Sequence, residues 1–134
     1  MIITLSVLLI VNAIALVYYW VDFYTRGGVQ VLKENWYIKF QKAFPVADIW
    51  AAACSIVCVV GLLTEQPYGL VFALIAASSI IFLGLMDVTF NIQNKLYRFV
   101  ATSSEMRAEL LGNAWFLGLG IALIACLSSR VALD

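Results

Sequence analysis

The stretch Leu83-Gly-Leu-Met-Asp-Val-Thr-Phe-Asn-Ile-Gln-Asn-Lys95 ends a long apolar run and brings polar side chains into it. In a helix, four polar residues stand at i, i+4, i+7 and i+11 and share one face: Asp87, Asn91, Asn94 and Arg98. Lipid penalises polar side chains, so such a face turns toward other helices or a water-filled cavity. The stretch therefore predicts a membrane-spanning helix and, on it, the location of a site.

Composition supports a membrane protein. Of the 134 residues, 64% are hydrophobic, and the mean hydropathy is +0.99. Soluble domains contain roughly 45–50% apolar residues. The chain has the length of one domain, 1–134. We therefore expect an integral protein of the cell or inner membrane, with membrane lipids as its first partners.

Charge and residue types exclude several function classes. Eight basic and eight acidic residues give zero net charge, and no basic cluster suits nucleic acid. The chain has no His, which is the commonest metal ligand and general base. Its three cysteines lie in apolar runs, where Cys packs as a small hydrophobic residue. We expect no metal and no cofactor, and whether the protein is an enzyme stays open.

Four apolar runs are each long enough for a transmembrane helix, at about 2–21, 46–63, 68–87 and 110–129. About 20 helical residues span the roughly 30 Å hydrocarbon core. The short connection Thr64-Glu65-Gln66-Pro67 makes the second and third runs antiparallel neighbours. Thr102 and Glu105 resemble a capping box before the last helix. The predicted fold is all-α, a polytopic antiparallel four-transmembrane-helix bundle.

Residues 29–44 differ from the four runs because they mix aromatic, apolar and lysine side chains. Val29, Leu32, Trp36 and Phe40 recur at three- and four-residue steps. This spacing predicts a short amphipathic helix lying in the membrane interface, with its lysines toward lipid phosphates. The alternative is a solvated loop with incidental periodicity.

The basic residues predict the orientation. Four lie between the first and second spans, three lie between the third and fourth, and Arg130 alone lies on the opposite side. Loops rich in Lys and Arg stay in the cytoplasm. Both termini are therefore predicted to lie outside.

Each span also carries a carboxylate toward the predicted cytoplasmic side. We expect these groups to line a polar pocket that opens toward the cytoplasm and binds a small hydrophobic, lipid-like or cationic amphiphilic molecule. The candidate ligand-binding residues are Asp48, Asp87, Asn91, Asn94, Glu109 and Asn113, with Trp50 and Trp115 in the walls. In the competing interpretation, Asp48 caps its helix and Asp87 pairs with Arg98 or Arg107 at the surface.

Two other functions fit the same sequence. Stripes of small residues on the second, third and fourth spans could face further subunits, in a homo-oligomer or as an accessory subunit of a larger membrane complex. Asp48 with Asp87, or Asp87 with Glu109, could instead serve as the acid/base pair of an enzyme acting on a lipid or sterol-like substrate.

Overall fold

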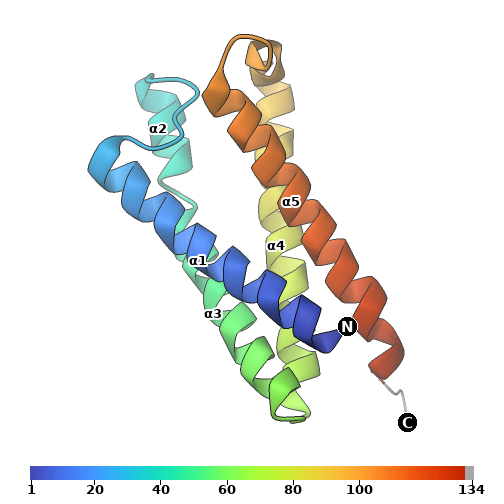
Figure 1. The fold of residues 1–134 in the computed structure, drawn as a ribbon. Coiled ribbons are helices and arrows are strands. Elements are labelled where there is room, and N and C mark those ends of the chain that lie inside the picture. Colours follow the sequence, from blue (N-terminus) through green and yellow to red (C-terminus); the bar gives the residue numbers. More distant parts are fainter. Residues whose placement is uncertain (132–134) are drawn as a thin grey trace.

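The computed structural model describes residues 1–131, and every regular element among them is helical (Figure 1). The elements are α1 (Ile2–Arg26), α2 (Asn35–Gln41), α3 (Pro45–Leu63), α4 (Tyr68–Gln93) and α5 (Ser104–Leu127), with 3-10 turns at Leu96–Phe99 and Ser128–Arg130. Four helical stretches are long and apolar enough to cross a membrane: α1, α2 with α3, α4, and α5. The prediction of an all-helical chain with four potential membrane spans is confirmed.

The long helices pack in a row rather than in a closed ring. Extensive contacts join α1 to α3, α3 to α4, and α4 to α5, and within residues 1–131 no comparable contact joins α1 to α5. In Figure 1, α1 and α5 diverge toward the upper end of the molecule, where α2 and the connection between α4 and α5 lie. One side of the helix assembly is therefore less tightly closed than the others.

Small residues bring α3 and α4 together. Ala51, Ala73 and Ala77 are buried in the main apolar cluster. Gly61 faces Gly69 across the two helices so closely that a Cβ built on Gly69 would lie 2.6 Å from the carbonyl carbon of Gly61. The absence of a side chain at either position lets the two backbones touch. On α5, by contrast, Gly118 is exposed, so this small residue does not serve packing within the chain.

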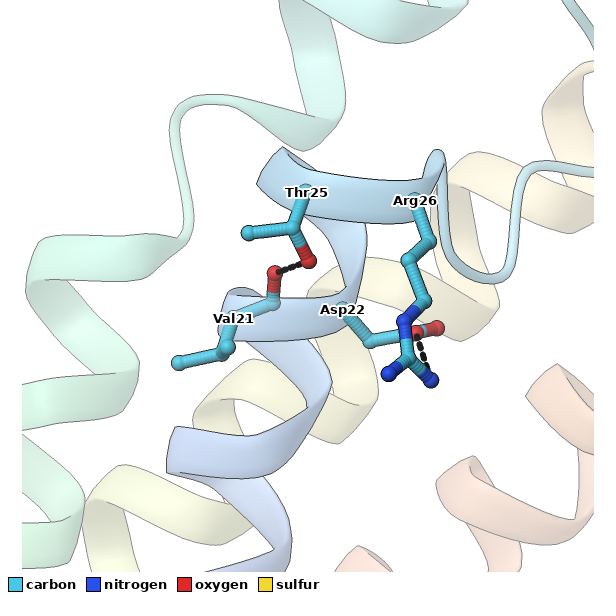
Figure 2. Close-up of polar contacts among 4 residues, drawn as sticks. All are labelled: Val21, Asp22, Thr25 and Arg26. Carbon is cyan, nitrogen blue, oxygen red and sulfur yellow. Dashed lines mark hydrogen bonds and ion pairs between the residues drawn. The ribbon is translucent and has the colours of Figure 1, made fainter.

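At the upper end, α1 continues to Arg26, five residues beyond the apolar run at 2–21. Figure 2 shows its last turn, in which the Thr25 hydroxyl donates to the Val21 carbonyl oxygen at 2.6 Å. Arg26 approaches Asp22 of the same turn at 4.0 Å. Gly27 then ends the helix with φ 88°, a left-handed conformation that glycine adopts without strain.

Other boundaries also differ from the predicted ones. The helix expected across 29–44 is limited to the seven residues of α2. α4 continues past Asp87 to Gln93, as its sequence allows. The last helix is capped by Ser103, whose hydroxyl accepts from the Met106 amide at 3.1 Å, and not by Thr102. These shifts are local because helix ends depend on which neighbouring hydroxyl reaches a free amide.

Candidate functional site

A cavity of about 290 Å³ lies toward the upper end, between α1, α3, α4 and α5. Its polar wall residues come from all five α-helices: Asn12, Gln41, Asp48, Asp87, Glu109 and Asn113. Its aromatic wall residues are Tyr19, Trp20, Phe44, Trp115 and Phe116. The structure thus brings together five of the eight residues predicted from the sequence: Asp48, Asp87, Glu109, Asn113 and Trp115.

Asp48 enters the cavity from the first turn of α3. Pro45 begins this helix, and the Asp48 side chain does not cap it. Instead, Asp48 Oδ2 accepts a hydrogen bond from the indole Nε1 of Trp20 at 2.7 Å. The residue is 5% exposed, and its Oδ1 has no hydrogen-bond partner among the described residues. One carboxylate oxygen is therefore held in place, and the other is free for a ligand.

Glu109 has the opposite character because both of its oxygens are occupied. Oε1 accepts from Asn91 Nδ2 at 2.9 Å, and Oε2 accepts from the Tyr37 hydroxyl at 3.0 Å. Tyr37 and Asn91 are fully buried. These bonds tie α5 to α4 and to α2. Glu109 therefore brings a carboxyl group to the cavity wall, and two neutral donors fix its geometry.

Asp87 is half-buried on α4 and also lines the cavity. Its helix packs between α3, which carries Asp48, and α5, which carries Glu109. The competing interpretation placed Asp87 in an ion pair with Arg98 or Arg107. Across residues 1–131, however, the sole ion pair is that of Arg26 with Asp22. The Arg98 guanidinium lies 4.7 Å from the centre of the Phe99 ring instead. Within residues 1–131, no basic side chain therefore forms an ion pair with any of the three cavity carboxylates.

A second polar contact lies deeper in the cavity wall. The indole Nε1 of Trp115 on α5 donates to Asn12 Oδ1 on α1 at 2.9 Å. Asn12 is 1% exposed, and its Nδ2 has no hydrogen-bond partner in the described part of the chain. Since the Trp115 bond occupies the amide oxygen, the free group of Asn12 is a donor.

Comparison with known proteins identifies no relative. No protein-family model, no curated protein and no solved structure matches this chain. Its function is therefore inferred from the geometry of the cavity.

Three of the predicted site residues lie elsewhere. Trp50 is 56% exposed on the outer face of α3, because two residues of helix turn it about 200° away from Asp48. Asn94 lies at the end of α4 and donates to the Phe90 carbonyl oxygen of its own helix at 2.9 Å. Asn91 lies behind Glu109 and does not line the cavity.

Sequence analysis did not assign to the site the polar and aromatic wall residues Asn12, Tyr19, Trp20, Gln41, Phe44 and Phe116, nor Tyr37, which donates to Glu109. A signal for two of them exists in the buried residues of α1, which follow three- and four-residue steps: Leu5, Leu9, Asn12, Leu16, Trp20 and Phe23. This face indicates that Trp20 points into the protein and not into the lipid headgroups. For Tyr37 and Gln41, the short length of α2 removes any comparable periodicity.

The cavity suits an organic cation better than a metal ion. Among residues 1–131, no three Cys, Asp or Glu side chains are gathered closely enough to hold a metal. The three carboxylates are instead spread over walls that are mainly apolar and aromatic. A cation larger than a metal ion can contact several carboxylates at once and lie against aromatic rings.

The cavity communicates with the outside between α1 and α5. Three small exposed residues belong to its wall, Ala15 on α1 and Ala108 and Gly112 on α5. A Cβ added to Gly112 would meet no atom within 4 Å. This opening lies on the side where α1 and α5 make fewer contacts with each other than the neighbouring helix pairs make.

Proposed function

We propose that the four long helices cross the membrane as an antiparallel bundle, with α2 in the interface and both termini outside. Seven of the eight basic residues belong to the segments at the upper end, and Arg130 follows α5 at the other end. The positive-inside tendency then favours a cytoplasmic upper end. In this orientation the cavity lies in the cytoplasmic half of the bilayer.

Within this bundle, the cavity binds an amphiphile that carries a cationic headgroup. The observation that supports this function best is the lack of any basic partner for Asp48, Asp87 and Glu109, which line one largely apolar cavity. Like charges that share a poorly solvated space repel each other. A bound ammonium group would relieve this repulsion and make charge-assisted hydrogen bonds to Asp87 and to Asp48 Oδ1.

The opening between α1 and α5 gives such a ligand a route from the membrane. An alkyl chain in the bilayer can enter sideways past Ala15 and Gly112, because Ala15 carries only a methyl group and Gly112 has no side chain. The headgroup then reaches the carboxylates without leaving the lipid phase, and the tail remains against apolar walls. Trp20 and Trp115 lie where their rings can contact the cation or the first part of the chain.

The experiment compares three 18-carbon amphiphiles binding to the protein in phosphatidylcholine nanodiscs, with empty nanodiscs subtracted: octadecylamine, octadecanol and stearate. We expect octadecylamine to bind at least tenfold more tightly than the alcohol, and stearate to show no specific binding. An alcohol or a fatty acid that bound as well as the amine would refute a cation site.

Two single variants locate the binding groups. Asp48→Asn and Asp87→Asn keep the shape of the side chain and remove its charge, so each is expected to weaken octadecylamine binding about 10- to 100-fold. The matched control is Glu65→Gln. Glu65 is an exposed acid in the turn between α3 and α4, at the end of the molecule opposite the cavity. If both aspartate variants bound the amine like Glu65→Gln, the proposal would fail.

A further inference from the structure

The cavity has a second polar group that the cation site does not use. Asn12 is 1% exposed and lines the cavity, and its Nδ2 hydrogens have no acceptor among residues 1–131. Its orientation is fixed because Trp115 donates to the other end of the same amide. A buried donor without an acceptor is unfavourable, so an acceptor supplied by a ligand would be stabilising there.

The distance between the two polar groups can be read from α1. Asn12 and Trp20 lie eight residues apart on one face of this helix, which corresponds to about 12 Å along its axis. Trp20 marks the level of the carboxylates because it holds Asp48. Between the two levels the α1 wall consists of Leu16, which is buried, Ala15 at the opening, and Tyr19 next to Trp20.

We propose that the ligand carries two polar groups: a cationic nitrogen at the carboxylates, and a hydrogen-bond-accepting oxygen inside its chain that binds Asn12 Nδ2. An extended chain advances about 1.1–1.2 Å per bond, so the oxygen lies about ten bonds from the nitrogen. The ligand class is therefore a long-chain amine with a mid-chain ether, carbonyl or hydroxyl oxygen. This inference rests on the proposed function and specifies its ligand.

The test is a positional scan on the unmodified protein in phosphatidylcholine nanodiscs. Three amines of equal chain length carry one ether oxygen, 5, 10 or 15 atoms from the nitrogen, and octadecylamine serves as the reference. One additional hydrogen bond predicts that the 10-position ether binds about five- to tenfold more tightly than octadecylamine. The other two ethers place their oxygens about five atoms from the level of Asn12, so they cannot form this bond and should bind less tightly than the 10-position ether. Equal binding of all three ethers would overturn the inference.

Two variants connect the preference to Asn12. Asn12→Leu is expected to abolish the advantage of the 10-position ether, measured as the ratio of its affinity to that of octadecylamine in the same variant. Trp115→Phe removes the donor that orients the amide, so the dependence on ether position should flatten. A preference for the 10-position ether that persists in Asn12→Leu would also overturn the inference.

The outcomes separate this inference from the proposed function. If octadecylamine itself does not bind, or binds independently of both Asp48 and Asp87, the cation site is wrong. If octadecylamine binds through Asp48 and the ether position has no effect, the cation site stands and the role of Asn12 is wrong. The scan needs no variant, so a failure of Asn12→Leu to fold does not affect it.

Discussion

The indole Nε1 of Trp20 donates a hydrogen bond of 2.7 Å to Oδ2 of Asp48 and so joins α1 to α3 beside the cavity. Both residues are buried. A neutral donor positions the carboxylate but does not cancel its charge, which a lysine or arginine at the same place would do. The Trp20–Asp48 pair therefore joins two helices and holds an acidic side chain at the cavity wall without an opposite charge beside it among residues 1–131.

Trp20→Phe is expected to destabilise the protein. An aromatic ring remains at the position, but the five-membered ring of the indole and its N–H are lost, so Asp48 Oδ2 has no donor, and an unpaired buried acceptor costs about 1–3 kcal/mol. The measurement is thermal unfolding in mild detergent, followed by circular dichroism. The matched control is Trp36→Phe, because Trp36 is exposed and donates only to exposed Glu34. Equal thermal stability of the two variants would contradict a structural role for the Trp20 bond.

Tyr37 and Glu109 are expected to be energetically coupled. Tyr37→Phe removes the hydroxyl that donates to Glu109 Oε2 from a fully buried position, at a cost of about 1–2 kcal/mol. Glu109→Gln replaces one of the two accepting oxygens with an NH2 group, so Tyr37 and Asn91 compete for a single acceptor. In a double-mutant cycle the pair should show a coupling energy of at least about 0.5 kcal/mol, measured by reversible unfolding in mixed micelles. Additive effects would mean that the contact between α2 and α5 adds no stability.

Gly69→Ala is expected to disrupt the packing of α3 on α4. The added Cβ would lie 2.6 Å from the Gly61 carbonyl carbon, so the backbones must separate. A loss of several kcal/mol is expected because backbone atoms cannot move aside as a flexible side chain can. Gly118→Ala is the control, since its Cβ would meet nothing within 4 Å. Detergent-solubilised yield and melting temperature report the difference, and a Gly69→Ala protein as stable as Gly118→Ala would refute the close contact.

The proposed orientation predicts which connections are reachable from outside the cell. With the three native cysteines replaced by alanine, Gln66→Cys in the turn between α3 and α4 should react with a membrane-impermeant maleimide in intact cells. Lys33→Cys, between α1 and α2, should react only after the membrane is permeabilised. Both positions are exposed in the structure, so a difference in labelling reports the side of the membrane. The reverse pattern would invert the topology.

Most of the fold can be predicted from the length of the apolar runs and from the residues that interrupt them. Each apolar run of about 20 residues becomes a long helix, and Pro45 and the turn before Tyr68 set two of the boundaries. The predicted helix ends are less accurate. α1 ends at Arg26 because Gly27 adopts a left-handed conformation, and α5 begins after Ser103 because its hydroxyl accepts from a free amide. Such contacts depend on local geometry that hydropathy does not describe.

Part of the site could be predicted from the sequence, because a charged side chain inside the hydrocarbon core of a membrane is energetically costly. Asp48, Asp87 and Glu109 stand out in apolar surroundings, and all three line the cavity. Trp50 was predicted to line the cavity because it is aromatic. Its position two residues after Asp48 on α3 instead turns its side chain away from the cavity. Asn12 and Tyr37 could not be assigned, because their roles depend on partners 103 and 72 residues away along the chain. Which helices become neighbours is decided by packing, which a single sequence does not display.

The most direct test of the central claim is a crystal structure grown from a lipid phase in the presence of octadecylamine carrying a terminal bromine. We expect elongated density in the cavity, with its amine within hydrogen-bond distance of Asp48 Oδ1 or Asp87 and the anomalous signal of the bromine toward the apolar end. A cavity closed by protein side chains, or an amine bound only on the outer surface away from both aspartates, would contradict the account.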